Sequence, residues 1–525
     1  MRTYTVLFQP AGKRQVMRQG ATLLEAAGLA GLTLQTACGG NGTCGKCQVL
    51  VGPEGRPVLA CQSSIDGDIE VTLPQATQPS DHRILLSGIG RPVEVCPTIE
   101  LSDPTQPLYG IACDVGTTTV VARLMDLKTG AWLATAATVN PQSRYGFDVI
   151  SRIHHAGTEG GFEELHRLIV DAVNRLIADL RQQTGVDRGQ IHELCVVGNT
   201  TMNHLFLGLP VRQLGQAPYA AFSVEAHDIP AAELGIEIRT TGNVHTVENI
   251  AGFVGSDTTA VAVAVDIGNA DRVTLALDIG TNGELLLAAR GKVYAASCAA
   301  GPAFEGATIG HGSRAVAGAI DRVTLLPQDI EVGVIGGGQP HSICGSGLVD
   351  AVAAMLDLGL LDTSGRLATP DGLPEGLPEA IGVRVLEVAG QPALALARDP
   401  QSGRPAVVLT QADIRQVQLA KAAIRAGVES LLHKTGLEGG IERVLLAGAF
   451  GNTIRPGGAV RIGLLPDVPL DRVTSVGNAA CVGAEMILVN RHCRTEAGRL
   501  ARSIEYVEIA RDPGFEQIYA AAMSF

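Results

Sequence analysis

The chain has few aromatic residues, no excess of basic residues and no long apolar run. Phe, Tyr and Trp make up 3% of its 525 residues, which argues against a module that stacks nucleic-acid bases on aromatic rings. Lys and Arg number 40 against 53 Asp and Glu, a formal charge of −13. Proteins that bind nucleic acid or anionic membranes need the opposite balance. The sequence therefore predicts neither a nucleic-acid partner nor a membrane surface.

A membrane span and a secretion signal are also missing. No stretch of 18 or more apolar residues occurs, and the most apolar run, near residues 260–270, is cut by Asp266 and Asn269. The first residues alternate like a strand and lack the apolar core of a signal peptide. We therefore expect a cytoplasmic protein, in which a reducing environment favours metal ligation over disulfides for the 11 cysteines.

Length and glycine content indicate several domains of an α/β enzyme. The chain is longer than one core usually needs. Its 64 glycines and 46% hydrophobic residues are typical of a folded protein with many tight turns rather than a disordered one.

Four of the cysteines fall within 24 residues, in the pattern C-x5-C-x2-C-x13-C: Cys38, Cys44, Cys47 and Cys61. Four thiolates suit tetrahedral zinc or a [2Fe–2S] cluster. A zinc ribbon usually has two C-x2-C pairs, and this segment has one. The four glycines between Cys38 and Cys47 favour iron, because they let the loop wrap closely and direct backbone N–H groups at the cluster sulfurs. Zinc stays the alternative.

Residues 1–74 resemble a [2Fe–2S] ferredoxin domain, with a first gap closer to the adrenodoxin-like branch than to the plant type. The resemblance implies a small α+β domain of the β-grasp type. Alternation and a polar cap predict its main elements: strands over Thr3–Gln9, Val16–Arg18, Gln48–Gly52 and Ile69–Leu73, and a helix over Thr22–Leu29. Six prolines between positions 74 and 107 predict a Pro-containing linker over 75–109, a tether with partial structure.

An apolar strand followed by Asp-x-Gly-Thr occurs twice, at Asp114 and Asp278, 164 residues apart. Backbone N–H groups and hydroxyls of such a turn can hold phosphate, and the aspartate can hold Mg²⁺ through water or position an attacking water. One copy is as often a plain hairpin, but two are much less expected by chance. The aspartates are the candidate catalytic residues, and the candidate phosphate-binding residues are Gly116, Thr117, Thr118, Gly280, Thr281, Asn282 and Gly283.

A third element follows an expected helix over Thr410–Thr435. An apolar strand starting at Val444 runs into a glycine turn that would face an adenine ring, at Gly448, Ala449, Phe450 and Gly451. Residues 297–306 are expected to open a helix whose Glu305 binds metal or ribose, with a purely structural role as an equal alternative.

These elements resemble the phosphate and adenosine motifs of the superfamily (ASKHA) of acetate kinases, sugar kinases, heat-shock ATPases and actin. The resemblance implies two ribonuclease-H-like halves, about 110–270 and 271–500 within a domain over 110–525, closing on ATP and Mg²⁺. Cys298 leaves a rival reading open. In activators of 2-hydroxyacyl-CoA dehydratases, similar residues ligate a cluster shared across a dimer, and Cys195 is the candidate here for the second cysteine that such a site needs.

The order of domains resembles the reductive activators of corrinoid proteins. The resemblance implies ATP-dependent transfer of one electron from a [2Fe–2S] cluster to Co(II), restoring Co(I) in a methyltransferase system. It implies a corrinoid protein and a low-potential electron donor as partners, and leaves a homodimer open. The alternatives are an activator of a dehydratase or ring reductase, a small-molecule kinase with a redox-regulatory domain, and a non-catalytic redox sensor.

Overall fold

The computed structural model describes residues 2–30, 32, 34, 42, 45, 47–73, 88–100, 103, 105–146, 148–280, 282–437 and 440–525. Cys38, Cys44 and Thr281 lie outside the described residues. The chain forms two compact units. The first contains Met1–Arg83 and Pro141–Leu165, and the second contains Ile84–Asn140 and His166–Phe525.

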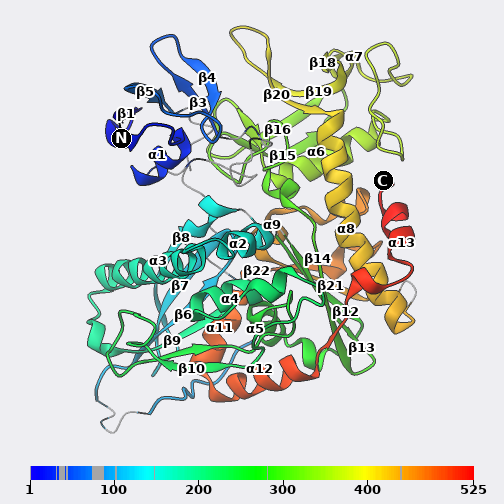
Figure 1. Cartoon of the computed structure of the whole chain (residues 1–525). Helices are drawn as coiled ribbons and strands as arrows, with labels where there is room; N and C mark the ends of the chain where they lie inside the picture. Colours follow the sequence, from blue (N-terminus) through cyan, green and yellow to red (C-terminus); the bar gives the residue numbers. More distant parts are fainter. Residues whose placement is uncertain are drawn as a thin grey trace. The chain divides into compact units, whose positions relative to one another are not determined.

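Among the described residues up to position 73, the first unit holds a five-stranded sheet with the order β2-β1-β5-β3-β4 and one helix, α1 (Figure 1). β1 pairs with β5 in parallel, and the other pairs are antiparallel. A mixed sheet of this kind with one packed helix is the predicted β-grasp arrangement. The elements are β1 Thr3–Gln9, β2 Lys13–Arg18, α1 Leu23–Leu29, β3 Gln48–Val51, β4 Arg56–Leu59 and β5 Ile69–Thr72. The same unit also contains η2 Pro141–Tyr145, α2 Val149–Ala156 and the start of α3 Gly161–Thr184.

Local chemistry explains these elements. Thr22 and Glu25 form a capping box that starts α1, and the apolar side chains of β1, Val6 and Phe8, are fully buried in the core of the domain. The predicted strands and helix are confirmed. β4 was not predicted, because it is short and contains Pro57, which an edge strand tolerates.

The second unit is built around two six-stranded sheets, β10-β11-β9-β6-β7-β8 and β22-β21-β12-β13-β14-β23. Five strands of each follow the same plan: a three-stranded antiparallel meander, then two further strands in parallel beside its first strand. The repeat of strand order and direction is the duplicated ribonuclease-H-like fold that the two Asp-x-Gly-Thr patterns predicted. The strands are β6 Tyr109–Val115, β7 Thr119–Asp126, β8 Trp132–Val139, β9 Ile191–Gly198, β10 His227–Pro230, β11 Asn243–Thr246, β12 Thr274–Ile279, β13 Gly283–Ala289, β14 Lys292–Cys298, β21 Arg443–Ala447, β22 Val473–Gly477 and β23 Glu505–Tyr506.

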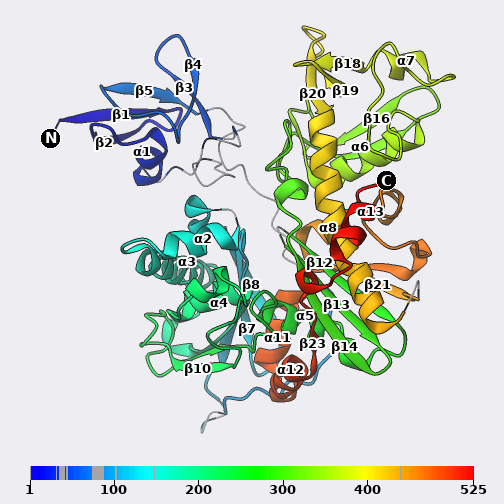
Figure 2. The same ribbon diagram turned by 45° about the vertical axis from the view of Figure 1, so that its right-hand side comes forward.

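Two helices join the halves of this unit. α5 Ser256–Ala264 and α11 Ala479–Val489 pack between the two sheets in one apolar cluster (Figure 2). They cross closely, since a Cβ atom at Gly483 would lie 2.0 Å from the Ala260 carbonyl oxygen. Only glycine fits this crossing.

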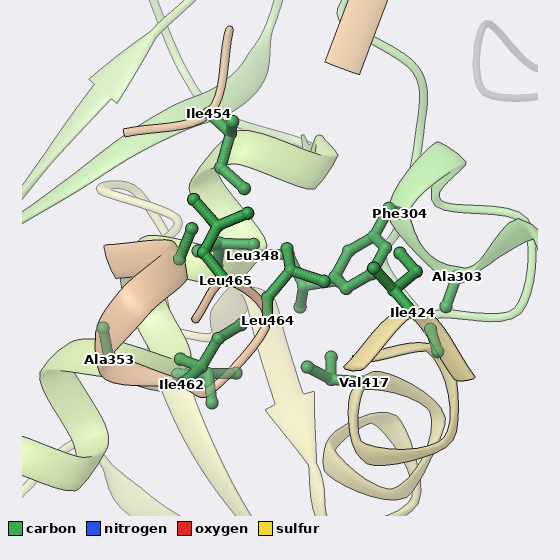
Figure 3. Close-up of a cluster of buried hydrophobic side chains, with 14 of the residues drawn as sticks. Ala303, Phe304, Leu348, Ala353, Val417, Ile424, Ile454, Ile462, Leu464 and Leu465 are labelled. Atoms are coloured by element: carbon green, nitrogen blue, oxygen red, sulfur yellow. The ribbon is translucent and has the colours of Figure 1, made fainter. Parts of the chain in front are cut away.

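The second half carries a larger apolar core and two small sheets. Figure 3 shows Phe304, Leu348, Val417, Ile424 and Leu464 directed toward one another, and all five are buried. α8 begins after Thr410 with a capping box to Asp413, as predicted. The elements are η6 Pro302–Glu305, β15 Ala319–Leu325, β16 Ile330–Val334, β17 Ser342–Ile343, α6 Gly345–Asp357, α7 Glu379–Gly382, β18 Val385–Val388, β19 Gln391–Arg398, β20 Pro405–Thr410, α8 Gln411–Thr435, α9 Gly448–Thr453, α10 Pro456–Arg461, α12 Arg491–Ser503 and α13 Phe515–Ala522.

Residues 88–100, in the Pro-containing segment, are hydrogen-bonded along the second unit. The Ile89 N–H donates to the Val476 carbonyl and the Cys96 N–H to the Val489 carbonyl, both at 2.8 Å. The Arg491 N–H donates back to the Cys96 carbonyl at 2.7 Å. This stretch is therefore part of the second unit. In the part of the chain that the structure describes, no helix is long and apolar enough to cross a bilayer.

Candidate functional site

Two of the four clustered cysteines lie within the described residues, and they converge. Cys47 precedes β3 and Cys61 follows β4, and their Sγ atoms are 3.3 Å apart. That separation is well beyond the roughly 2.0 Å of a disulfide bond. Both side chains are buried, and the Gln62 amide donates toward Cys61 Sγ at 3.7 Å. Two buried thiols side by side, with an N–H donor to one sulfur, fit two ligands of an iron–sulfur cluster.

The two described glycines of the cysteine loop, Gly42 and Gly45, also fit an iron–sulfur cluster site. Gly42 and Gly45 have φ angles of +77° and +68°, which only glycine adopts readily. A Cβ atom at Gly42 would also lie 2.9 Å from Gln62 Cγ. The loop therefore needs glycine at these two positions.

The first phosphate turn connects β6 to β7. The Gly116 N–H donates to the Thr119 carbonyl at 3.0 Å, and a Cβ atom at Gly116 would lie 2.7 Å from that oxygen. Thr117 Oγ1 accepts a hydrogen bond from Asn199 Nδ2 at 2.7 Å. Asn199 also caps α4 (Thr200–Leu207) through the Met202 N–H. Gly116 therefore closes the turn, and the helix-capping residue Asn199 orients it through Thr117. Asn199 was not among the site residues predicted from the sequence.

The second phosphate turn connects β12 to β13. The Gly280 N–H donates to the Asn282 carbonyl at 2.9 Å. Asp278 lies opposite Glu284 across the antiparallel pair, and Gly283 begins β13. The residue pairing places Ala447 of β21 on the other side of Asp278. Gly448 follows with φ +79°, and a Cβ atom there would lie 2.2 Å from Asp278 Oδ1, so this position must be glycine.

The two predicted aspartates belong to a group of four acidic side chains: Asp114, Asp257, Asp278 and Glu284. Burial, and then the negative charge of Asp257 and Asp278, raises the pKa of Asp114 to about 8. Burial and the charge of Asp257 raise the pKa of Asp278 to about 7. All four residues keep partial contact with solvent. They therefore form a partly solvent-accessible acidic cluster, where a cation would relieve their repulsion.

Asp257 and Glu284 were not selected from the sequence. Asp257 lies in the first turn of α5 and Glu284 near the start of β13. Burial, followed by the charges of Asp257 and Asp278, raises the pKa of Glu284 well above its ordinary value. The sequence signal that could have identified Asp257 is its place in a Gly-Ser-Asp segment at the start of a helix of small residues. Among the described residues, no three His, Cys, Asp or Glu side chains are arranged to hold a metal ion directly.

The carboxyl cluster predicts a dependence of stability on pH. Since the folded state raises the pKa values of Asp114 and Asp278 from 3.8 to about 8 and about 7, it binds more protons than the unfolded state. The stabilisation is complete below pH 3.8 and is lost as the pH rises toward 8, so the free energy of unfolding should fall between pH 5 and pH 8. Thermal unfolding without nucleotide should show this fall, and Asp114→Asn should flatten it. A variant profile parallel to the parental one would refute the effect.

The expected adenosine turn is a helix. Gly448, Ala449, Phe450 and Gly451 lie in α9, which starts directly after β21. The prediction of a glycine turn was wrong here, because the positive φ at Gly448 turns the chain in a single residue and α9 follows at once. The Phe450 ring stacks on the Phe304 ring with centroids 4.9 Å apart, which ties α9 to the core in Figure 3.

Glu305 connects the two halves. It ends η6, and its Oε2 accepts a hydrogen bond from Thr118 Oγ1 in the first phosphate turn at 3.3 Å. The helix expected to open within residues 297–306 is only this four-residue 3₁₀ turn. Gly301 and Gly306, with φ +74° and +76°, bound it on both sides.

Cys298 and Cys195 do not form a pair. Cys298 ends β14, and its Sγ donates to the Gly283 carbonyl at 3.1 Å beneath the second phosphate turn. Cys195 is buried within β9 of the other sheet. Their placement gives no support to a second cluster within one chain.

Three family models match the chain. Residues 8–66 match the 2Fe-2S iron-sulfur cluster binding domain, residues 109–270 the RACo middle region, and residues 272–525 the C-terminal domain of RACo, the ASKHA domain. The chain is 32% identical to the corrinoid activation enzyme RamQ of Eubacterium limosum over 98% of each protein. It belongs to the RACo family.

Other proteins similar to this RACo-family chain agree. It is 25% identical to the [Co(II) methylated amine-specific corrinoid protein] reductase of Methanosarcina barkeri, over 80% of this chain and 77% of that one. The solved structure of a reductive activator for corrinoid, iron-sulfur protein matches with a TM-score of 0.72 and 31% identity, over 99% of this chain and 98% of that one. The predicted fold class, a [2Fe–2S] domain followed by an ASKHA-type domain, is confirmed.

Proposed function

We propose that this RACo-family protein is an ATP-hydrolysing redox activator that returns the Co(II) of a corrinoid protein to Co(I). The observation that carries the proposal is the presence, in one chain, of a converging cysteine pair and an acidic cluster that includes the aspartates of both phosphate turns. The relatives named as a corrinoid activation enzyme and a corrinoid protein reductase support it.

The cysteines hold the electron carrier. Cys38, Cys44, Cys47 and Cys61 are the proposed ligands, and a [2Fe–2S] cluster supplies one-electron transfer at a potential near about −400 mV. Burial of Cys47 and Cys61 keeps water from their sulfurs. Reduced thiols are needed for ligation, which suits a cytoplasmic location.

The cleft holds the nucleotide. Asp114 and Asp278 are the proposed catalytic residues, holding Mg²⁺ through water and orienting the attacking water. The phosphates lie on the two turns, at Gly116, Thr117 and Thr118 and at Gly280, Thr281, Asn282 and Gly283. Gly448–Gly451 form the adenine side. Because this cleft draws residues from both halves of the second unit, ATP binding and hydrolysis can bias how far the halves close.

Reduction of Co(II) needs this coupling between the nucleotide and the conformation of the two halves. A [2Fe–2S] cluster held by the four cysteines would supply the one electron, received from a low-potential donor, that converts Co(II) to Co(I). For one electron, about 59 mV is a tenfold change in equilibrium constant, so a gap of about 100–200 mV corresponds to about 2–5 kcal/mol. Differential binding of the nucleotide to two conformations can supply a free energy of this size.

The direct test combines the protein with a corrinoid protein in the Co(II) state, a low-potential reductant, ATP, Mg²⁺ and methyl donor. Methyl-Co(III) should accumulate, and inorganic phosphate should equal the ADP formed. Transfer of phosphate to a metabolite would instead favour the kinase alternative. Nucleotide binding without hydrolysis would favour the redox sensor.

Iron content separates the proposal from a dehydratase activator. The purified protein should contain about two irons per chain, and Cys298→Ala should leave that number unchanged, because the Cys298 thiol is hydrogen-bonded to the Gly283 carbonyl. Iron above this number that disappears in Cys298→Ala would support the second-cluster reading.

A further inference from the structure

The loop after η6, residues 306–318, is locked into one shape beside the nucleotide cleft. A Cβ atom at Gly306 would lie 2.4 Å from the Ser313 nitrogen, and one at Gly312 would lie 2.4 Å from the Gly306 carbonyl oxygen. The start of the loop at Gly306 therefore lies directly against Gly312 and Ser313. This contact places the residue after Ser313, Arg314, next to the residue before Gly306, Glu305.

A second set of contacts fixes the base of Arg314. The Ser313 N–H donates to the Ile343 carbonyl at 2.9 Å, and Ser313 Oγ donates to Ser342 Oγ at 2.8 Å. Both partners belong to β17, which leads into α6. Arg314 thus projects from a braced position and not from a loose surface loop.

The charge of Glu305 acts on Arg314. Burial lowers the pKa of Arg314, yet a guanidinium stays protonated at neutral pH. Glu305 in turn accepts the hydrogen bond of Thr118. Thr118, Glu305 and Arg314 therefore interact in sequence, and this series leads from the first phosphate turn into the second half of the second unit.

We propose that Arg314 contacts the terminal phosphate of ATP, held in place by Glu305 in the nucleotide-free protein. The inference rests on the proposed ATP hydrolysis and names a further catalytic residue for it. Four acidic side chains already line this cleft, so a triphosphate needs cations besides Mg²⁺. A guanidinium supplies a charge and a planar pair of donors that match phosphate oxygens.

The reaction gives Arg314 a defined task. The water oxygen forms a bond to the γ-phosphorus, and the bond from that phosphorus to the β,γ-bridging oxygen breaks with its electron pair staying on ADP. The proton of the water passes to solvent as inorganic phosphate forms. Arg314 stabilises the negative charge on the γ-phosphoryl oxygens during this transfer.

The test compares full-length parent, Arg314→Gln and Arg314→Lys, with Arg322→Gln on the exposed face of β15 as control. Affinities for ADP and for a β,γ-imido analogue of ATP are measured with Mg²⁺, together with ATPase rates and iron content. Arg314→Gln should lower ATPase kcat about 100-fold. It should weaken the affinity for the triphosphate analogue about tenfold or more and the affinity for ADP less than about twofold. Arg314→Lys should keep part of the preference for the triphosphate analogue over ADP. Arg322→Gln should match the parent in both affinities and in ATPase rate.

The outcomes separate this inference from the proposed function. If the parent prefers the triphosphate and Arg314→Gln keeps the same preference and rate, the assignment of Arg314 is overturned and the ATPase stands. Equal losses for ADP and the analogue also overturn it, since the residue then acts on the site as a whole. A parent that binds no nucleotide overturns both.

Discussion

Replacing Cys61 with serine should abolish reduction of the corrinoid protein and leave ATP hydrolysis near the parental rate. Cys61 Sγ lies 3.3 Å from Cys47 Sγ inside the first unit, and a hydroxyl is a poor ligand for iron at that place. Loss of one ligand should bleach the cluster and lower the rate of Co(I) formation by about 100-fold or more, because no other carrier replaces it. The residues of the nucleotide cleft all lie in the second unit, so ATPase activity should change less than about twofold.

The matched control is Cys96→Ser. Cys96 is a half-buried cysteine outside the clustered four, and its backbone bonds to Val489 and Arg491. It should keep its iron, its visible spectrum and its reductase rate. A Cys61→Ser protein that retains two irons and full reduction would remove Cys61 from the ligand set.

Replacing Asp278 with asparagine should reduce ATP turnover and, at the same time, stabilise the nucleotide-free protein at pH 8. The amide keeps the shape of the carboxyl group beside Gly448 but removes one of the four acidic groups of the cluster. ATPase kcat should fall about 10²- to 10³-fold, as expected for loss of a group that holds metal and orients water. The melting temperature at pH 8 should rise, because the pKa of Asp278 is raised to about 7 in the folded protein and its ionisation there costs stability.

Asp271→Asn is the control for this prediction. Asp271 lies just before β12, its side chain is 79% exposed, and it pairs with the neighbouring Arg272 at the surface. Both the turnover and the melting temperature should match the parent. Parental turnover in Asp278→Asn would show that this turn does not hold the reacting nucleotide.

Much of this architecture was predictable, because the signals were local or repeated. Alternation marks β1, Thr22 marks the start of α1, and Thr410 marks the start of α8. The two Asp-x-Gly-Thr patterns indicated two halves because each follows an apolar strand, and the strand orders confirm the duplication. Each of these features depends on a few neighbouring residues.

The rest depends on contacts between distant segments. Nothing near Asp257 in the sequence shows that α5 directs it toward Asp278, and only the fold reveals that Glu284 faces the same cleft. The prediction of a turn at Gly448 failed because one residue with a positive φ, beside the Asp278 carboxyl, is enough to start α9. The role now proposed for Arg314 depends on Gly306 meeting Ser313, which no short motif encodes.

A single-turnover experiment tests most directly whether nucleotide drives an electron from the cluster to cobalt. The protein is reduced, freed of excess reductant and mixed with a Co(II) corrinoid protein, with and without ATP and Mg²⁺, while the Co(II) and Co(I) absorption bands are followed. With ATP and Mg²⁺, Co(I) should form as the cluster is oxidised, and without nucleotide Co(II) should persist. Formation of Co(I) at the same rate and yield without nucleotide would contradict the coupling and leave a ferredoxin domain joined to an ATPase that it does not use.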